Sequence, residues 1–214
     1  MADLAEPPFV AIWSDYICPF CHVARERAEW LQKNAGAVIE WLPFDLHPEY
    51  PPEGIPRADL LKRYGDHFTE AVRNAAIEAG VGYNPHPDVV PNSRKALELS
   101  EWARGKGPEA HEALHQRIMT AYWSEARDIG RWEELEACLT DVGLDPAEGR
   151  DAVESGAYAA AVDASTQHAQ RAGISAVPAF VFDGRLLVSG AVPHEGFERA
   201  LEKLAEMRAA DPPA

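Results

Sequence analysis

The chain has little cysteine, a deficit of positive charge and no long hydrophobic run. Only 3 of its 214 residues are cysteine, and 20 Lys and Arg residues stand against 35 Asp and Glu. The net charge of -15 argues against nucleic acid and anionic membranes as partners. No apolar stretch reaches the length of a membrane span, and the acidic segment from Met1 to Pro8 does not resemble a signal peptide. We therefore expect a cytoplasmic protein, and structural disulfides are rare in that compartment.

The sequence also lacks a glycine-rich phosphate loop and a cluster of metal-ligating residues. We therefore expect neither a bound nucleotide cofactor nor a metal. A length of 214 residues, of which 46% are hydrophobic, suits one large domain or one domain with an insertion. Folding of a chain of this size buries about 70% of the unfolded surface, so the fold needs no stabilising crosslink.

The most informative feature present is the motif Cys18-Pro19-Phe20-Cys21. It follows an apolar run from Phe9 to Trp13 that predicts a buried strand, and it begins a helical pattern that continues to about Asn34. The first sulfur is therefore expected beside the unpaired N–H groups of the first helical turn. Negative charge is stabilised there, so a thiol at this position becomes a nucleophile more readily. Pro19 suits the first turn because its missing N–H is tolerated there.

Four interpretations of this cysteine pair are open: a redox couple, half of a zinc site, c-type haem attachment through Cys-x-x-Cys-His22, and two cysteines without chemistry. A structural zinc site needs about four ligands, and the only other cysteine, Cys138, has no partner cysteine near it. Haem attachment would need export and a second axial ligand. The redox couple is therefore favoured. Cys138 shares an apolar face with Leu135 and Leu139, which predicts a buried, inert thiol.

The segments around this motif predict a single α/β fold. Val38 to Phe44 predicts a second strand, which a right-handed crossover places parallel to the first. Near the end of the chain, two apolar runs flank Asp183-Gly184-Arg185, which is a strong hairpin signal, and a last helix is expected from Gly196 to Met207.

The middle of the chain is different, because its periodicity is helical almost throughout from about Arg57 to Gly173. We therefore predict a β-α-β half in residues 1–55 and an α-β-β-α half in residues 157–214. Residues 56–156 form an all-helical insertion between them.

This pattern resembles the DsbA family of the thioredoxin superfamily, and most of all its FrnE-like branch and the 2-hydroxychromene-2-carboxylate isomerases. The likeness covers nearly the whole chain and rests on four segments: Ser14 to Cys21, Trp41 to Pro48, Gly173 to Val181, and Ser189 to Pro193. The cysteine motif followed by Val177-Pro178-Ala179-Phe180-Val181 is a specific signal, whereas either alone would be weak. The resemblance implies a thioredoxin fold that contains the helical insertion.

The resemblance also implies roles for individual residues. Cys18 is expected to attack a disulfide and form a mixed disulfide, and Cys21, lying deeper, is expected to resolve it. A cis peptide bond is implied between Val177 and Pro178, opposite the cysteines. This bond would leave the Val177 backbone free to pair with an extended substrate chain.

Four further residues near the cysteines are candidates for substrate binding or tuning. Pro19 and Phe20 lie at the tip of the helix, and Phe20 is expected to be an exposed hydrophobic contact for substrate. Asp15 is a candidate for proton transfer to Cys21, although an Asp here more often caps the following turn. His22 is expected at the surface, with the tuning of Cys18 as an alternative role.

We therefore expect a DsbA-like thiol–disulfide oxidoreductase or isomerase that acts on protein or small-molecule disulfides. Because Phe20 stands where DsbA proper has His, a weaker oxidant is expected, and the reducing cytoplasm favours reduction or isomerisation. One alternative is a glutathione-dependent isomerase or transferase of an aromatic small molecule, with glutathione as co-substrate and Trp102, Tyr122 and Trp123 around an apolar pocket. Another is a partner-binding protein without catalysis. The sequence does not indicate the oligomeric state.

Overall fold

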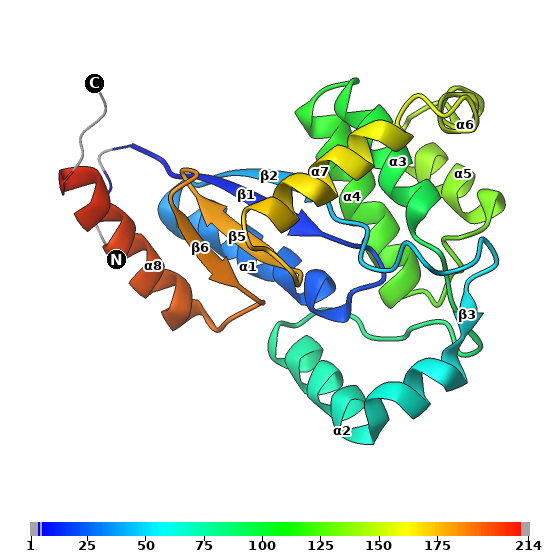
Figure 1. Cartoon of the computed structure of the whole chain (residues 1–214), viewed down its shortest axis with the longest axis horizontal. Coiled ribbons are helices and arrows are strands. Elements are labelled where there is room, and N and C mark those ends of the chain that lie inside the picture. Colours follow the sequence, from blue (N-terminus) through cyan, green and yellow to red (C-terminus); the bar gives the residue numbers. More distant parts are fainter. Residues whose placement is uncertain (1–3, 5, 211–214) are drawn as a thin grey trace.

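The computed structural model describes residue 4 and residues 6–210 (Figure 1). Residues 1–3 and 5 belong to the segment in which no signal peptide is expected, and they lie outside the described residues. A mixed sheet with the strand order β2-β1-β5-β6 forms the centre of the α/β part. Its strands are β1 (Phe9–Ser14), β2 (Val38–Pro43), β5 (Ala179–Phe182) and β6 (Leu186–Ser189).

The pairing of these strands confirms the β-α-β unit and the hairpin. Strand β1 runs parallel to β2 and antiparallel to β5, and helix α1 (Pro19–Ala35) makes the crossover between β1 and β2. Strands β5 and β6 are antiparallel, and the turn between them has positive φ at Asp183 (50°) and Gly184 (65°). Asp and Gly tolerate this conformation better than most residues, which explains the hairpin signal in the sequence.

Alternation along β1 divides the hydrophobic core into two clusters. Val10 and Ile12 point to one face of the sheet, where they pack with α1 and with α8 (His194–Ala210). Ala11 and Trp13 point to the other face and join a larger cluster that includes the helices in the middle of the chain. Successive side chains of a strand face opposite sides, so β1 is buried on both. The central strand thereby connects the sheet to the helical part.

The middle of the chain is mainly helical, as expected, and its helices lie at one end of the molecule and beneath the sheet (Figure 1). They are α2 (Arg57–Glu78), α3 (Arg94–Arg104), α4 (Pro108–Trp123), α5 (Trp132–Asp141), α6 (Pro146–Glu154) and α7 (Ala159–Arg171). Helix α8 lies at the opposite end, where Arg208 donates to the Glu6 carbonyl at 2.7 Å. In the part of the chain that the structure describes, no helix is long and apolar enough to cross a membrane.

One small sheet was missed by the sequence patterns. Strands β3 (Ile55–Pro56) and β4 (Val89–Val90) pair antiparallel in segments for which the sequence predicts no strand. Gly54 precedes β3 with φ 78°, and a Cβ at this position would lie 2.4 Å from the Val90 carbonyl oxygen. Glycine is therefore needed for this close approach. The expected domain boundary at residue 55 falls inside β3.

Candidate active site

Cys18 lies where α1 begins. It is the N-cap residue, with extended φ and ψ of -83° and 118°, and the first helical turn contains no acidic side chain. The Cys18 carbonyl accepts hydrogen bonds from the amides of Cys21 (3.1 Å) and His22 (3.4 Å). The unpaired N–H groups of the first turn and the helix dipole favour negative charge at this end of the helix. The local structure thus places Cys18 at the N-terminal end of α1.

The Cys18 thiol contacts a segment that is far away in the sequence. Its Sγ donates to the carbonyl oxygen of Val177 at 3.3 Å, across 159 positions. The Val177–Pro178 peptide bond is cis, as the resemblance implied. The Pro178 carbonyl in turn accepts from the Gly190 amide at 2.8 Å, so this loop is fixed to the turn after β6. The fold therefore brings Cys18, Val177 and Pro178 together.

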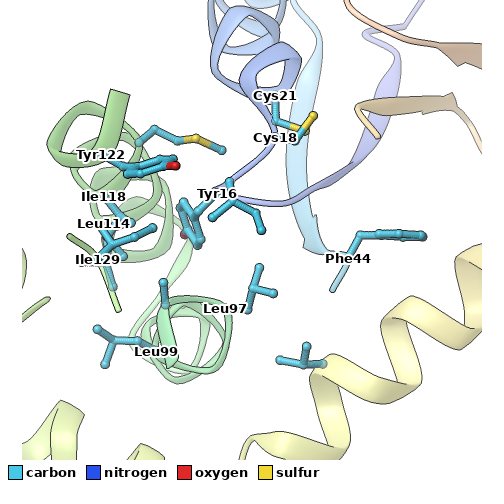
Figure 2. Close-up of a cluster of buried hydrophobic side chains, with 14 of the residues drawn as sticks. Tyr16, Cys18, Cys21, Phe44, Leu97, Leu99, Leu114, Ile118, Tyr122 and Ile129 are labelled. Carbon is cyan, nitrogen blue, oxygen red and sulfur yellow. The ribbon is translucent and has the colours of Figure 1, made fainter. Parts of the chain in front are cut away.

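Cys21 lies deeper than Cys18, with exposed fractions of 0% and 6% respectively, which agrees with the expectation for a resolving thiol. Both thiols are free (Figure 2). Burial raises the pKa of Cys21 well above its ordinary value, and the neighbouring Cys18 raises it further. The Ser14 hydroxyl and the Asp15 backbone amide act in the opposite direction, because they favour the thiolate. Cys21 is therefore protonated at neutral pH.

Asp15 holds the loop that precedes α1. Its carboxylate is fully buried and accepts from the amides of Ile17 (3.1 Å) and Leu46 (2.8 Å). Burial raises the pKa of Asp15 to about 6, and these hydrogen bonds oppose that effect. The side chain thus fixes the turn before the helix, as a capping residue does, and joins it to the segment after β2.

The expectation that His22 lies at the surface is wrong, because the side chain is 1% exposed. Its Nε2 lies 2.7 Å from the Gly82 carbonyl, its Nδ1 lies 3.3 Å from Arg25, and the ring stacks on Trp123. Burial, followed by the charge of Arg25, lowers the pKa of His22 to about 4. A neutral imidazole held in this way ties α1 to the segment after α2 and brings no positive charge to Cys18.

Phe20 was expected to be exposed, but it is half-buried against α2. Its ring meets Phe68 edge to face at 6.1 Å, and Phe68 stacks on Tyr64 at 5.0 Å. Helix α2 bends next to these rings at Gly65, whose φ of 74° and ψ of 177° are not helical. Pro19 is also half-buried, at the first position of α1. Helix α2 therefore covers the tip of the cysteine motif.

The aromatic residues that suggested an apolar pocket belong to the core. Trp102, Tyr122 and Trp123 are at most 4% exposed. The indole of Trp123 donates to the Tyr16 carbonyl at 2.8 Å. Figure 2 shows the Tyr16 side chain among residues of α3 and α4, and its hydroxyl pairs with Ser100 of α3. Sequence spacing showed that these residues were apolar but not whether they line a pocket or fill the core.

A groove of about 370 Å³ runs beside the cis-proline loop, between α7 and the segment after β2. Its lining is mixed: it includes the apolar side chains Phe44, Leu46 and Pro48, the carboxyl groups of Asp45 and Asp163, the amides of Gln167 and Gln170, and the hydroxyl groups of Thr166 and Ser175. Ser175 is two residues from Val177, so the groove lies close along the chain to the backbone that Cys18 contacts.

A mixed sheet with a Cys-x-x-Cys motif at a helix N-terminus, facing a cis-proline loop, defines a thioredoxin-fold protein with a dithiol site. A family model of the DSBA-like thioredoxin domain matches residues 9–202, and the chain belongs to this family. The uncharacterized protein YwbO of Bacillus subtilis is 30% identical over 193 residues, which are 90% of this chain and 94% of YwbO.

Solved structures are similar over almost the whole chain. A probable DsbA oxidoreductase from Streptomyces coelicolor has a TM-score of 0.82 at 27% identity, covering 92% of this chain and 89% of the other. A 2-hydroxychromene-2-carboxylate isomerase has a TM-score of 0.77 at 20% identity, covering 94% and 98%. The cytosolic disulfide reductase DsbM from Pseudomonas aeruginosa has a TM-score of 0.69 at 18% identity, covering 92% of this chain and 98% of DsbM. At these identities the last two establish the fold alone.

Proposed function

We propose that this protein is a thiol–disulfide oxidoreductase in which Cys18 is the nucleophile and Cys21 the resolving thiol. One observation carries the proposal: two free thiols stand at the N-terminus of α1, and the outer one touches the Val177 carbonyl of the cis-proline loop. Membership of the DSBA-like family supports an enzyme of the oxidoreductase or isomerase type.

The reaction consists of two exchange steps. The Cys18 thiolate attacks one sulfur of a substrate disulfide, forms a mixed disulfide and releases the other sulfur as a thiolate. Cys21 then loses its proton and attacks the Cys18 sulfur. The second substrate sulfur leaves as a thiolate, and a Cys18–Cys21 disulfide remains. Two electrons have passed from the dithiol to the substrate, and the reverse sequence oxidises a substrate dithiol.

The cis-proline loop is the proposed binding surface. The Cys18 thiol now donates to the Val177 carbonyl, and loss of that proton frees the carbonyl to accept an amide from an extended substrate. The adjoining groove would hold residues next to the substrate disulfide. Its amides, hydroxyl groups and three apolar side chains suit a peptide or a small thiol such as glutathione, so we propose both protein disulfides and glutathione disulfide as substrates.

We propose that the protein acts in the cytoplasm as a reductase or isomerase. Phe20 rests on Phe68 and brings no charge to the site, so no cation between the cysteines favours the reduced form. The reducing poise of that compartment draws electrons toward substrate disulfides.

Equilibration of the protein across glutathione redox buffers, followed by alkylation and mass measurement, tests the proposal. A single two-thiol transition restricted to Cys18 and Cys21 is expected, and a midpoint near about −270 mV would identify a reductase, whereas about −180 to −120 mV would identify an isomerase or oxidant. The Cys21→Ser variant should trap a mixed disulfide at Cys18, and Cys138→Ser should behave like the parent protein. Absence of a Cys18–Cys21 disulfide at every poise would refute the proposal.

A glutathione-dependent isomerase of an aromatic small molecule is the second candidate. The observation in its favour is the fold shared with 98% of a 2-hydroxychromene-2-carboxylate isomerase chain. In that case Cys21 is dispensable, and turnover of an aromatic substrate would survive Cys21→Ser.

A further inference from the structure

A small buried pocket lies among β1, β2, α3 and α4. Seven of the residues that line it carry polar groups: Ser14, Tyr16, Trp41, Ser100, Glu101, His111 and His115. Its volume of about 10 Å³ is close to the room that one water molecule requires.

Several polar atoms that line this pocket have no protein partner. Among the described residues, the Ser14 hydroxyl, the Trp41 indole nitrogen and both ring nitrogens of His115 make no hydrogen bond. All three side chains are at least nine-tenths buried. Buried polar groups are almost always paired with protein or with ordered water, and a buried water usually makes about three hydrogen bonds. The pocket therefore has both the size and the donors and acceptors for a bound water.

The pocket adjoins Cys21 through Ser14. The Ser14 hydroxyl lies beside the Cys21 thiol and favours its thiolate form. A serine hydroxyl can accept one proton while it donates another. Ser14 therefore lines the pocket and, although it makes no hydrogen bond to the protonated thiol, is near enough to Cys21 to stabilise its thiolate.

His115 faces the pocket from α4 and stacks on Trp41, with a centroid distance of 4.1 Å. His111, four residues earlier on the same helix, lines both this pocket and a surface groove of about 710 Å³ along β2. Residues four apart on a helix lie on the same face. His111 and His115 therefore lie on one face of α4, and His111 borders both the pocket and the surface groove.

We propose that Ser14, a water in this pocket, His115 and His111 form the proton relay of Cys21. The inference rests on the proposed function, because only thiol exchange requires Cys21 to lose and regain a proton.

The proton movements balance in each direction. As the Cys21 sulfur attacks Cys18, its proton passes to the Ser14 oxygen, and Ser14 passes its own proton to the water. The water passes a proton to one nitrogen of His115, which releases another from its second nitrogen toward His111 and the groove. The departing substrate thiolate takes up a proton from solvent. When the Cys18–Cys21 disulfide is reduced, the same chain returns a proton to Cys21.

The charges around His115 keep it suited to this role. Burial lowers the pKa of His115 well below its ordinary value, and His111 on α4, Arg25 on α1 and Arg104 on α3 lower it further. Burial, followed by Arg104, lowers the pKa of His111 to about 4. Both rings are therefore neutral at physiological pH, and a neutral imidazole has one donor and one acceptor nitrogen. The other polar side chains at this pocket are Tyr16, Ser100 and Glu101.

His115→Phe tests the relay, because phenylalanine preserves a ring against Trp41 but carries no proton. The matched control is His168→Phe, which replaces an exposed imidazole stacked on Trp13 at 5.9 Å. Reduced protein is mixed with oxidised glutathione, the reaction is quenched with acid, and the mass of the protein is measured by mass spectrometry. The first step, formation of the mixed disulfide between glutathione and Cys18, is measured in a Cys21→Ser background. The second step is measured as the loss of glutathione from Cys18 when Cys21 is present.

We expect His115→Phe to slow the second step by about 100-fold at neutral pH, the scale of general acid–base catalysis, and to leave the first step unaltered. The defect should shrink as the pH rises, because hydroxide then removes the Cys21 proton directly. His168→Phe should leave both steps unaltered. A second step as fast as that of the parent protein would overturn the relay, and so would equal slowing of both steps.

Ser14→Ala provides an independent test if His115→Phe does not fold. It should slow the second step in the same pH-dependent way, and Ser14→Thr, which keeps the hydroxyl, should restore it. A normal rate in Ser14→Ala would also overturn the relay. Failure of the proposed function looks different, because no mixed disulfide would then form at Cys18 in the Cys21→Ser background.

Discussion

The buried carboxylate of Asp15 accepts a hydrogen bond of 2.8 Å from the backbone amide of Leu46. Asp15 precedes the nucleophile by three positions, and Leu46 follows β2, so this bond ties the cysteine loop to the segment that leaves β2 at the same end of the parallel strand pair. A second bond to Ile17 holds the loop itself. The position of Cys18 thus depends on a titratable group that is sealed from solvent.

Asp15 predicts a specific pH dependence of stability. Burial raises its pKa to about 6, above the ordinary value of 3.8, so between about pH 4 and 6 the folded state binds more protons than the unfolded state. The free energy of unfolding therefore falls as the pH rises through this window, by about 3 kcal/mol at about 1.4 kcal/mol per unit of pKa. Asp15→Asn has no such group. Denaturant unfolding at several pH values measures the difference in the free energy of unfolding between the parent protein and the variant. This difference should shrink by that amount from pH 4 to 7, and a constant difference would contradict the prediction.

Arg94 should contribute more to stability than most surface cations. Its guanidinium bonds Asp45 (3.1 Å), Glu98 (2.6 Å) and Asp163 (2.6 Å), and thereby joins the segment after β2 to α3 and α7. Asp45 and Glu98 are nearly buried, so removal of the Arg94 guanidinium leaves both carboxylates without a positive partner. Arg94→Met should lower the free energy of unfolding by about 3 kcal/mol. The control Arg131→Met breaks an exposed pair with Glu133, which solvent screens, and should therefore cost much less. If both variants lost the same free energy of unfolding in urea, the three ion pairs of Arg94 would contribute no more than an exposed pair.

Gly54 and Gly80 form a matched pair for a test of close backbone approach. Both have positive φ, 78° and 66°, but a Cβ at Gly54 would lie 2.4 Å from the Val90 carbonyl oxygen, whereas a Cβ at Gly80 meets nothing within 4 Å. Gly80→Ala should cost only the conformational strain of about 1–2 kcal/mol. Gly54→Ala should cost about 2 kcal/mol more, because the β3–β4 pair must shift. Thermal unfolding of the two variants checks this difference, and similar melting temperatures would refute it.

Cys138 should remain inert during thiol chemistry. Its side chain is fully buried, and burial raises the pKa of its thiol to about 11. At about pH 8 only about a thousandth of such a thiol is ionised, and the thiolate is the reactive form. Iodoacetamide should therefore leave Cys138 unlabelled in the native protein and modify it in guanidinium chloride, as peptide mass mapping would show. Native labelling of Cys138 as fast as a free thiol would contradict its burial.

Local patterns predicted much of the fold. The apolar run of β1, the Asp183-Gly184 turn and the helical period of the middle segment depend on neighbouring residues, and each predicted the correct structure. The β3–β4 pair was missed because its strands are two residues long and more than thirty positions apart. Such a pairing depends on a close backbone approach that leaves no periodicity.

The site was predicted less evenly. The cysteine motif and the family resemblance led to Cys18, Cys21 and the cis bond at Pro178. The burial of His22 was missed, since it depends on Trp123, a hundred positions away. His115 was not predicted, because an isolated histidine in a helical segment has no sequence pattern that indicates a function. Its position beside Ser14 and Trp41 is evident only in the structure.

The bond from the Trp123 indole to the Tyr16 carbonyl has an evolutionary consequence. Tyr16 stands two positions before the nucleophile, and its buried hydroxyl pairs with Ser100 of α3. A descendant that deleted α3 and α4 would expose this ring and leave the carbonyl without its donor, directly beside the reactive sulfur. The helical insertion is therefore a structural support of the cysteine loop, and a chain without it would need another donor for the Tyr16 carbonyl.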